Sequence, residues 1–215
     1  MTLFEVPDRA LEITGWFGKL PGMGDFGQRR LPPRFREIWD EWLQQGLLTL
    51  RAEREDWLAH YLQAPIWFFA LGEGIMSPSP WIGVLMPSVD SVGRYFPLTV
   101  ATELVPGNPA SSELQMLGIH QWWLRNARAA LAALDGNMGA VSFESLLHSA
   151  CNESAEPEIP FTSMSDLPGA GMSSWCVHAG AAHGIVETVT NLPKAAGFGV
   201  LFGYANSVVA NQGLP

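Results

Sequence analysis

Three short apolar runs in the middle of the chain constrain the fold most, because each has the length and composition of a buried strand. They cover residues 66–71, 81–86 and 96–101. Proline and glycine residues separate them, as they do between the strands of a sheet. This spacing predicts an antiparallel meander, and we expect the whole sheet to hold at least five strands.

Two longer segments repeat their apolar residues at the period of an amphipathic helix. The first begins at Pro32-Pro33 and continues to about residue 50, since proline is favoured in a first helical turn. The second covers about 112–134 and ends at Asp135-Gly136. Their apolar positions are Phe35, Ile38, Trp39, Trp42, Leu43, Leu47 and Leu50 in the first, and Met116, Ile119, Trp123, Ala127, Ala130 and Leu134 in the second.

Weaker patterns complete the prediction. Short helices are expected at 57–62 and 143–150, and further strands at 13–20, 175–178, 184–190 and 199–204; residues 152–171 read as a loop. This order predicts an α+β fold, in which helices pack against a mostly antiparallel sheet.

The composition excludes several classes of partner. The 215 residues carry a net charge of −9, with 47% hydrophobic and 15% charged residues. Such a field repels phosphate backbones and anionic lipid, so we expect neither nucleic acid nor a membrane surface as partner. No signal peptide or membrane-spanning run is evident, and two cysteines make no disulfide framework. These features favour a cytoplasmic protein.

Gly22, Gly24 and Gly27 match the spacing G-x-G-x-x-G of a dinucleotide-binding loop. In such a loop the helix begins at the third glycine, and its N-terminal amides meet the pyrophosphate. Here the segment 28–33 intervenes before the helix, and no second strand ends in an acidic residue about 20 positions later. The glycines therefore indicate a tight turn, and we expect no cofactor.

Cysteine and histidine residues suggest two further sites. His148 with Cys151, and Cys176 with His178, could together hold zinc, although structural zinc sites usually show tighter paired spacing. Cys176 with His178 or His183 could act as nucleophile and base. Nothing in the sequence supplies an orienting third group or an oxyanion hole. We expect neither a metal site nor catalytic residues, and a hydrolase using Cys176 and His178 remains the less favoured alternative.

Trp122 has two interpretations. It is the neighbour of Trp123 on the predicted helix, about 100° away, so it lies at the edge of the apolar stripe. Trp122 either packs against the C-terminal part of the chain or anchors a partner protein, since interface hot spots favour tryptophan.

Two motifs, about 75 residues apart, resemble signatures of the TagF/ImpM family of type VI secretion proteins. They are Gly15-Trp16-Phe17-Gly18-Lys19-Leu20-Pro21-Gly22-Met23-Gly24-Asp25-Phe26, continuing into Arg30-Leu31-Pro32, and Asp90-Ser91-Val92-Gly93-Arg94-Tyr95-Phe96-Pro97-Leu98. Trp39-Asp40-x-Trp42-Leu43 lies between them. The similarity is strong from about residue 14 to 102 and weaker beyond, where Trp175 and Leu192-Pro193 resemble family landmarks.

The resemblance implies a bacterial accessory protein that represses type VI secretion after translation by binding a forkhead-associated-domain component. It implies no catalytic residues, so we expect no enzyme; a structural subunit of the secretion assembly is the alternative. The first half, about 13–135, fits a longin-like or profilin-like layout, and 136–215 forms a C-terminal extension of one domain spanning 1–215.

The two motifs also lead to a geometric prediction. Each follows a strand-like run and carries glycine where a sharp turn is needed, so we expect 22–26 and 90–94 to lie side by side. Charges inside apolar stretches need partners, and Arg94 is the natural partner for Asp25 or Asp90. The residues singled out as partner-binding or structural are Lys19, Asp25, Arg30, Asp90, Arg94 and Trp122.

Overall fold

The computed structural model describes residues 3–6, 14–107, 111–152, 164–177 and 186–204. Seven strands form one sheet in the order β3-β2-β6-β5-β4-β8-β9, and every neighbouring pair is antiparallel. Their bounds are β2 Gly15–Gly18, β3 Gly27–Arg29, β4 Trp67–Leu71, β5 Trp81–Met86, β6 Leu98–Glu103, β8 Met172–Val177 and β9 Val186–Thr190. The prediction of an α+β fold with an antiparallel sheet of at least five strands is confirmed.

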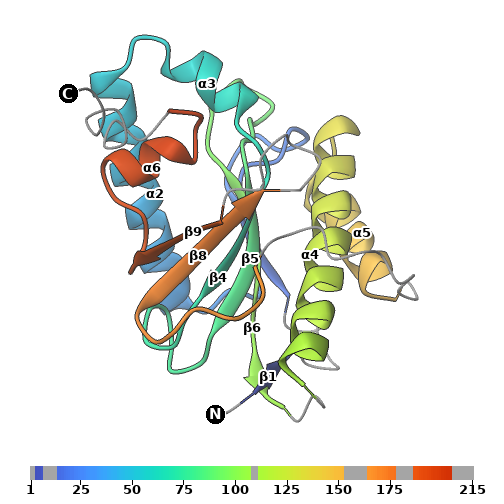
Figure 1. Ribbon diagram of the computed structural model, residues 1–215. Coiled ribbons are helices and arrows are strands. Elements are labelled where there is room, and N and C mark those ends of the chain that lie inside the picture. Colours follow the sequence, from blue (N-terminus) through green and yellow to red (C-terminus); the bar gives the residue numbers. More distant parts are fainter. Residues whose placement is uncertain (1–2, 7–13, 108–110, 153–163, 178–185, 205–215) are drawn as a thin grey trace, which may run out of the picture.

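A separate pair of strands, β1 Phe4–Glu5 and β7 Val105–Pro106, lies near the start of helix α4. The helices are α2 Pro33–Glu53, α3 Trp57–Gln63, α4 Ser112–Asp135, α5 Ala140–Asn152 and α6 Ala196–Val200. Figure 1 shows α2, α3 and α6 on one side of the sheet and α4 and α5 on the other. None of the described helices is both long enough and apolar enough to cross a membrane.

Both faces of the central strands are buried, since every residue of β4 and β5 is buried. Side chains alternate between the two faces along a strand. Trp67, Phe69 and Leu71 of β4 therefore belong to the core beneath α2, whereas Phe68 and Ala70 belong to the core beneath α4. This double burial explains why the strand runs are apolar without polar alternation.

Aromatic side chains of α2 fill the core on its side of the sheet. The Trp39 indole donates a hydrogen bond to the Thr99 hydroxyl at 2.8 Å, and the Trp42 indole donates to the Pro193 carbonyl at 2.7 Å. The Phe35 ring lies 4.5 Å from that of Trp81. Buried indole N–H groups need such acceptors, and these bonds connect α2 to β6 and to the C-terminal part of the chain.

Helix α4 is buried on more than one side, because it packs against the sheet and against α5. The hydroxyl of Ser111 caps its start by accepting from the Leu114 N–H at 3.2 Å, and Gly136 follows its last residue as predicted. Trp123 and Trp122 are both buried in the same core. The helix therefore buries a broader surface than one stripe of apolar residues would suggest.

The prediction of a strand at 199–204 is wrong. Residues 196–200 form α6, and 201–203 form a turn. Phe198, Leu201 and Phe202 are all buried on the α2 side of the sheet, and their spacing i, i+3, i+4 belongs to a helical turn. The predicted strand at 96–101 begins two residues later, at Leu98.

Several sequence predictions fall outside the described residues. They concern Ile13, residues 153–163 of the expected loop, and the start of the strand at 184–190. His178 and His183, the proposed partners of Cys176, also lie outside them, and the side chain of Cys151 is not described.

Gly46 of α2 provides a test of the packing between α2 and α6. A Cβ atom at this position would lie 2.3 Å from the Phe198 ring, so we expect Gly46→Ala to destabilise the protein by about 1–2 kcal/mol through overpacking. Gly118→Ala in α4 is the matched control, because nothing lies within 4 Å of its Cβ position. Alanine loses less backbone entropy than glycine when a helix forms, so Gly118→Ala should stabilise the protein by about 0.5–1 kcal/mol. Urea unfolding of both variants measures whether each change raises or lowers the free energy of unfolding. Stabilisation by Gly46→Ala would contradict the observed packing of α2 against α6.

Candidate functional site

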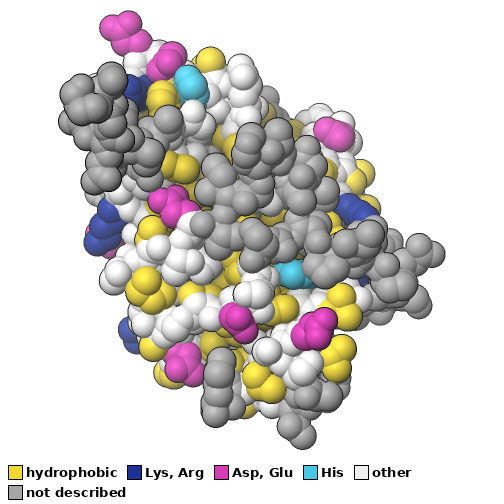
Figure 2. All heavy atoms as spheres, viewed as in Figure 1, with side chains coloured by type: hydrophobic (Ala, Val, Ile, Leu, Met, Phe, Trp, Pro, Cys, Tyr) yellow, Lys and Arg dark blue, Asp and Glu magenta, His cyan; other side chains and the backbone are white. Residues whose placement is uncertain are grey.

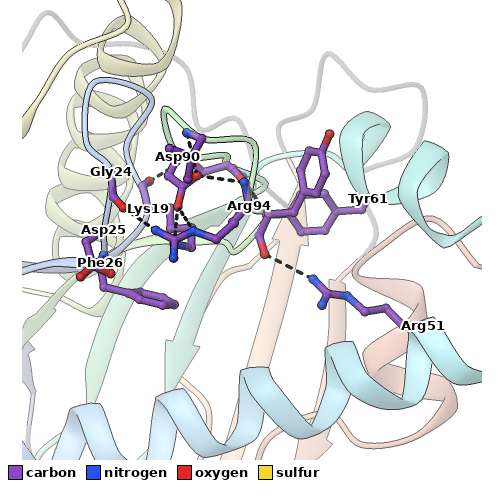
Figure 3. Close-up of polar contacts among 11 residues, drawn as sticks. Lys19, Gly24, Asp25, Phe26, Arg51, Tyr61, Asp90 and Arg94 are labelled. Atoms are coloured by element: carbon purple, nitrogen blue, oxygen red, sulfur yellow. Dashed lines mark hydrogen bonds and ion pairs between the residues drawn. The ribbon is translucent and has the colours of Figure 1, made fainter.

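The two sequence motifs form loops that lie side by side. The first loop connects β2 to β3, and the second connects β5 to β6. The Ser91 N–H donates to the Met23 carbonyl at 2.8 Å, and Arg94 reaches from the second loop to the Gly24 carbonyl. Figure 3 shows Arg94 pointing across to the first loop. The predicted adjacency of 22–26 and 90–94 is confirmed.

Lys19 and Asp90 form a buried ion pair between these loops. The Lys19 ammonium lies 2.6 Å from Asp90 Oδ2, and the two side chains are 4% and 0% exposed. The ammonium also lies over the Phe26 ring, 4.1 Å from its centroid. Charges in so dry a place are tolerated where they are paired and hydrogen-bonded. Lys19, which sequence reasoning had not paired with Asp90, is therefore the buried partner.

Asp90 accepts hydrogen bonds on both carboxylate oxygens. Oδ2 accepts from Lys19 and from Arg94 Nε, the latter at 2.7 Å, whereas Oδ1 accepts from the backbone N–H groups of Val92 at 3.1 Å and Arg94 at 2.9 Å. Gly93, with φ +84°, allows the chain to turn back tightly around the carboxylate. One carboxylate thus organises its own loop and joins it to the neighbouring one.

The electrostatics of this cluster favour the ionised carboxylate. Burial alone would raise the pKa of Asp90, but the hydrogen bonds from Lys19, Arg94 and Val92 outweigh it and hold that pKa well below its ordinary value of 3.8. At neutral pH the cluster contains two cations and one anion, so it has one excess positive charge.

The sequence predicts that Arg94 pairs with either Asp25 or Asp90, and the structure shows the pair with Asp90. Among the described residues no ion pair joins Asp25 to Arg94. Asp25 is exposed, and its carboxylate accepts from the neighbouring Phe26 N–H at 2.8 Å. Because water solvates the Asp25 carboxylate, this charge does not require a protein cation.

Helices α2 and α3 hold the second loop from the opposite side. The Tyr61 hydroxyl donates to the Ser88 carbonyl at 2.8 Å and accepts from the Ser88 N–H at 2.9 Å. Burial raises the pKa of Tyr61, so the phenol stays neutral and can donate. The Ser88 hydroxyl donates to the Lys19 carbonyl at 2.7 Å, and Arg51 reaches the Tyr95 carbonyl (Figure 3). These contacts attach the loop pair to α2 and α3.

The remaining candidate residues form a second cluster at the other end of β2. Arg30 Nε donates to the Thr14 carbonyl at 2.7 Å, and its two terminal nitrogens donate to the two Glu144 oxygens at 2.7 and 3.2 Å. The Trp122 indole donates to the Thr14 hydroxyl at 3.3 Å, and Trp16 donates to Glu144. Burial alone would raise the pKa of Glu144. The hydrogen bonds from Arg30 and Trp16 outweigh this effect, so the pKa lies below its ordinary value.

The six candidate residues therefore separate into two groups. Lys19, Asp90 and Arg94 meet at one end of β2, with Asp25 nearby in the first loop, whereas Arg30 and Trp122 meet around Thr14 at the other end. Trp122 is only 4% exposed, which argues against a surface anchor, and its indole bonds to Thr14 rather than to the C-terminal part of the chain that its structural interpretation names. Sequence reasoning did not find Glu144 or Tyr61, because other polar residues lie on the same predicted helices and no local pattern distinguishes these two.

The structure describes only part of the alternative sites suggested by sequence, and the described residues provide no support for them. Gly22 to Gly27 form the β2–β3 turn, and Gly27 lies in β3 rather than at a helix start. Cys176 lies in β8 and is 1% exposed within the core beneath α4. In the described part of the chain, no three His, Cys, Asp or Glu side chains are grouped so that they could hold a metal ion.

A cavity of about 660 Å³ lies between α2 and residues 191–204. Trp42, Leu50 and Phe198 supply apolar lining, and Glu41, Glu53, Arg54 and Lys194 contribute charged groups. Its volume is that of a small-ligand pocket. Sequence reasoning missed it, because the predicted strand at 199–204 would not have formed its wall. On the face shown in Figure 2, the visible charged side chains of described residues are scattered and form no basic stripe.

Comparison with known proteins agrees with the motifs. Residues 15–150 match the family model of the TagF N-terminal domain, described as type VI secretion system-associated. The crystal structure of PA0076 from Pseudomonas aeruginosa PAO1 is similar, with 31% identity and a TM-score of 0.70 over 94% of this chain and 100% of that chain. A search of curated proteins found no match.

Fold, motifs and comparisons together define a protein associated with type VI secretion. The family model covers more than half of the chain, and the chain belongs to the TagF N-terminal domain family.

The buried ion pair predicts an order of mutational effects. Lys19→Met leaves the buried Asp90 carboxylate without its ammonium, and we expect it to lower the free energy of unfolding by about 3 kcal/mol. Arg94→Met should cost about 1 kcal/mol, because its side chain is 54% exposed and water screens the charge. Chemical denaturation of both variants tests this order. A larger loss for Arg94→Met would contradict Lys19 as the buried partner.

The lowered pKa of Asp90 predicts a pH dependence. A depressed folded-state pKa stabilises the protein above the ordinary value of 3.8, and this stabilisation is lost as the pH falls through the folded-state value. The melting-temperature difference between wild type and Asp90→Asn should therefore stay constant between about pH 6 and 8 and shrink below about pH 4. Asp25→Asn, which removes an exposed carboxylate, is the control. A difference that grows on acidification would refute the assignment.

Proposed function

We propose that this chain is a post-translational negative regulator of type VI secretion that acts in the cytoplasm by binding a forkhead-associated-domain component. The observation that carries the proposal is the pair of signature loops, which are fixed by a buried ion pair and yet keep Phe26 and Arg94 partly exposed. A rigid surface that combines an aromatic ring with an arginine suits protein binding. Membership of a secretion-associated family supports the same function.

The proposal includes a binding role without catalysis. Cys176, the candidate nucleophile, is 1% exposed and belongs to a packed apolar core, so a substrate could reach its thiol only by displacing core side chains. The proposal also treats 1–215 as one domain. Its support is that β8, beyond the family match, pairs with β4, and that Trp42 of α2 bonds to Pro193.

Deletion of the gene tests the regulatory role. In a strain with an active secretion system, deletion should raise the amount of secreted effector protein in the medium while transcript levels of the system stay unchanged. Quantitative mass spectrometry of the medium and RNA measurements report the two quantities. Complementation with the intact chain is the control. Unchanged secretion after deletion would count against a repressor.

Co-purification separates the regulator from a structural subunit. A tagged chain that regulates by binding should co-purify with a soluble forkhead-associated-domain component. A structural subunit should instead sediment with the assembled secretion apparatus, and that result would favour the alternative.

A further inference from the structure

The two signature loops expose apolar side chains at fixed positions. Phe26 is 44% exposed and Val92 is 66% exposed. The covered side of the Phe26 ring stacks on Phe17, with centroids 5.8 Å apart, and meets Phe96 edge to face at 4.8 Å. The ring orientation is therefore fixed before any partner arrives, which reduces the entropy cost of binding. Phe26, Val92 and Arg94 are together called the loop face.

Arg94 adds hydrogen-bond donors to the loop face. A guanidinium has five N–H donors. Nε donates to Asp90 and Nη2 donates to the Gly24 carbonyl, whereas Nη1 has no hydrogen-bond partner among the described residues. The side chain is 54% exposed. The two bonds hold the guanidinium in place and leave its remaining donors available to an acceptor from outside.

The charge of the loop face restricts the partner. Lys19 and Arg94 surround one carboxylate, Asp90, so a single positive charge is in excess, in a chain whose net charge is −9. One excess charge matches a carboxylate, whereas a phosphate group carries about −1.5 to −2. The exposed Asp25 carboxylate, next to Phe26, adds a negative charge beside this surface, and its repulsion is greater for a doubly charged phosphate group than for a single carboxylate. Arginine and carboxylate also form strong, well-directed hydrogen bonds.

We propose that the loop face is the surface by which this chain docks its protein partner, and that it binds a partner segment with a carboxylate beside an apolar depression. The carboxylate accepts from Arg94, and the apolar depression covers Phe26 and Val92. Lys19 and Asp90 act as positioning residues beneath this surface. This assignment rests on the proposed function, since it names the surface through which the forkhead-associated-domain component is bound.

The test measures binding of the purified chain to the purified forkhead-associated-domain component of the same secretion cluster, by calorimetry. Val92→Lys and Val92→Glu form a matched pair at an exposed position whose backbone N–H alone joins the Asp90 network. Both lose the same apolar contact, but they differ in charge. We expect Val92→Glu to bind about tenfold more weakly than Val92→Lys. Phe26→Ala should also weaken binding about tenfold, as hot-spot aromatics do.

The controls separate folding from binding. Leu48→Ser changes an exposed apolar residue of α2 outside the loop face and should leave the affinity unchanged. Melting temperatures identify any variant that loses binding by unfolding, and the Val92 pair then decides the outcome. Treatment of the partner with phosphatase should not alter binding. Loss of binding after this treatment would show that Arg94 binds a phosphorylated residue and would overturn the assignment of a carboxylate.

The outcomes distinguish the two levels of the proposal. Binding by the unaltered chain together with equal affinities for the Val92 pair and for Phe26→Ala would overturn the loop face and leave the proposed function intact. Absence of binding by the unaltered chain would overturn the proposed partner, and the assignment of the surface with it. Loss in Phe26→Ala and Val92→Glu, with retained binding in Leu48→Ser, supports both.

Discussion

Strands β4 and β5 are buried along their whole length, and the arrangement of the other elements follows from this constraint. Antiparallel sheets commonly leave one face to water, but a strand with large apolar side chains on both faces needs a cover on each side. Helix α2 supplies the aromatic cover on one face, and α4 supplies the cover on the other. The C-terminal strands β8 and β9 then extend the same sheet beyond β4.

The same sheet brings the charged cluster together. Strand β2 pairs with β3 and with β6, and β6 pairs with β5. Because all three pairings are antiparallel and lie in one sheet, the β2–β3 loop and the β5–β6 loop lie at the same end of the strands. Lys19 leaves the end of β2, and Asp90 begins the turn of the other loop. In this dry position the ion pair is stable because Asp90 is also bonded by Arg94 and by two backbone N–H groups.

The two ends of β2 have different roles in this arrangement. At one end, Arg30 and Trp16 bind Glu144 and thereby attach the β2–β3 hairpin to α5. At the other end, Lys19 and Asp90 fix loops that still expose Phe26 and Val92. The first motif thus contains both an attachment to the helical layer and a partly exposed surface. Its polar residues stabilise the fold at both ends of β2, and partner binding is proposed only for the end that exposes Phe26.

The sequence by itself determined the elements whose pattern is local. The 3.6-residue period fixed α2 and α4, apolar runs fixed β4 and β5, and glycine with charge inside apolar stretches predicted that the two loops meet. Only the tertiary structure decided that Lys19 is the buried partner of Asp90, that Asp25 remains in water, that Trp122 is buried beside Thr14, and that 196–200 form a helix. The physical reason is that the spacing of apolar residues along the chain indicates which face of a helix or strand is buried. The choice between alternative charge partners depends instead on distances and burial that exist only after the sheet has brought remote segments together.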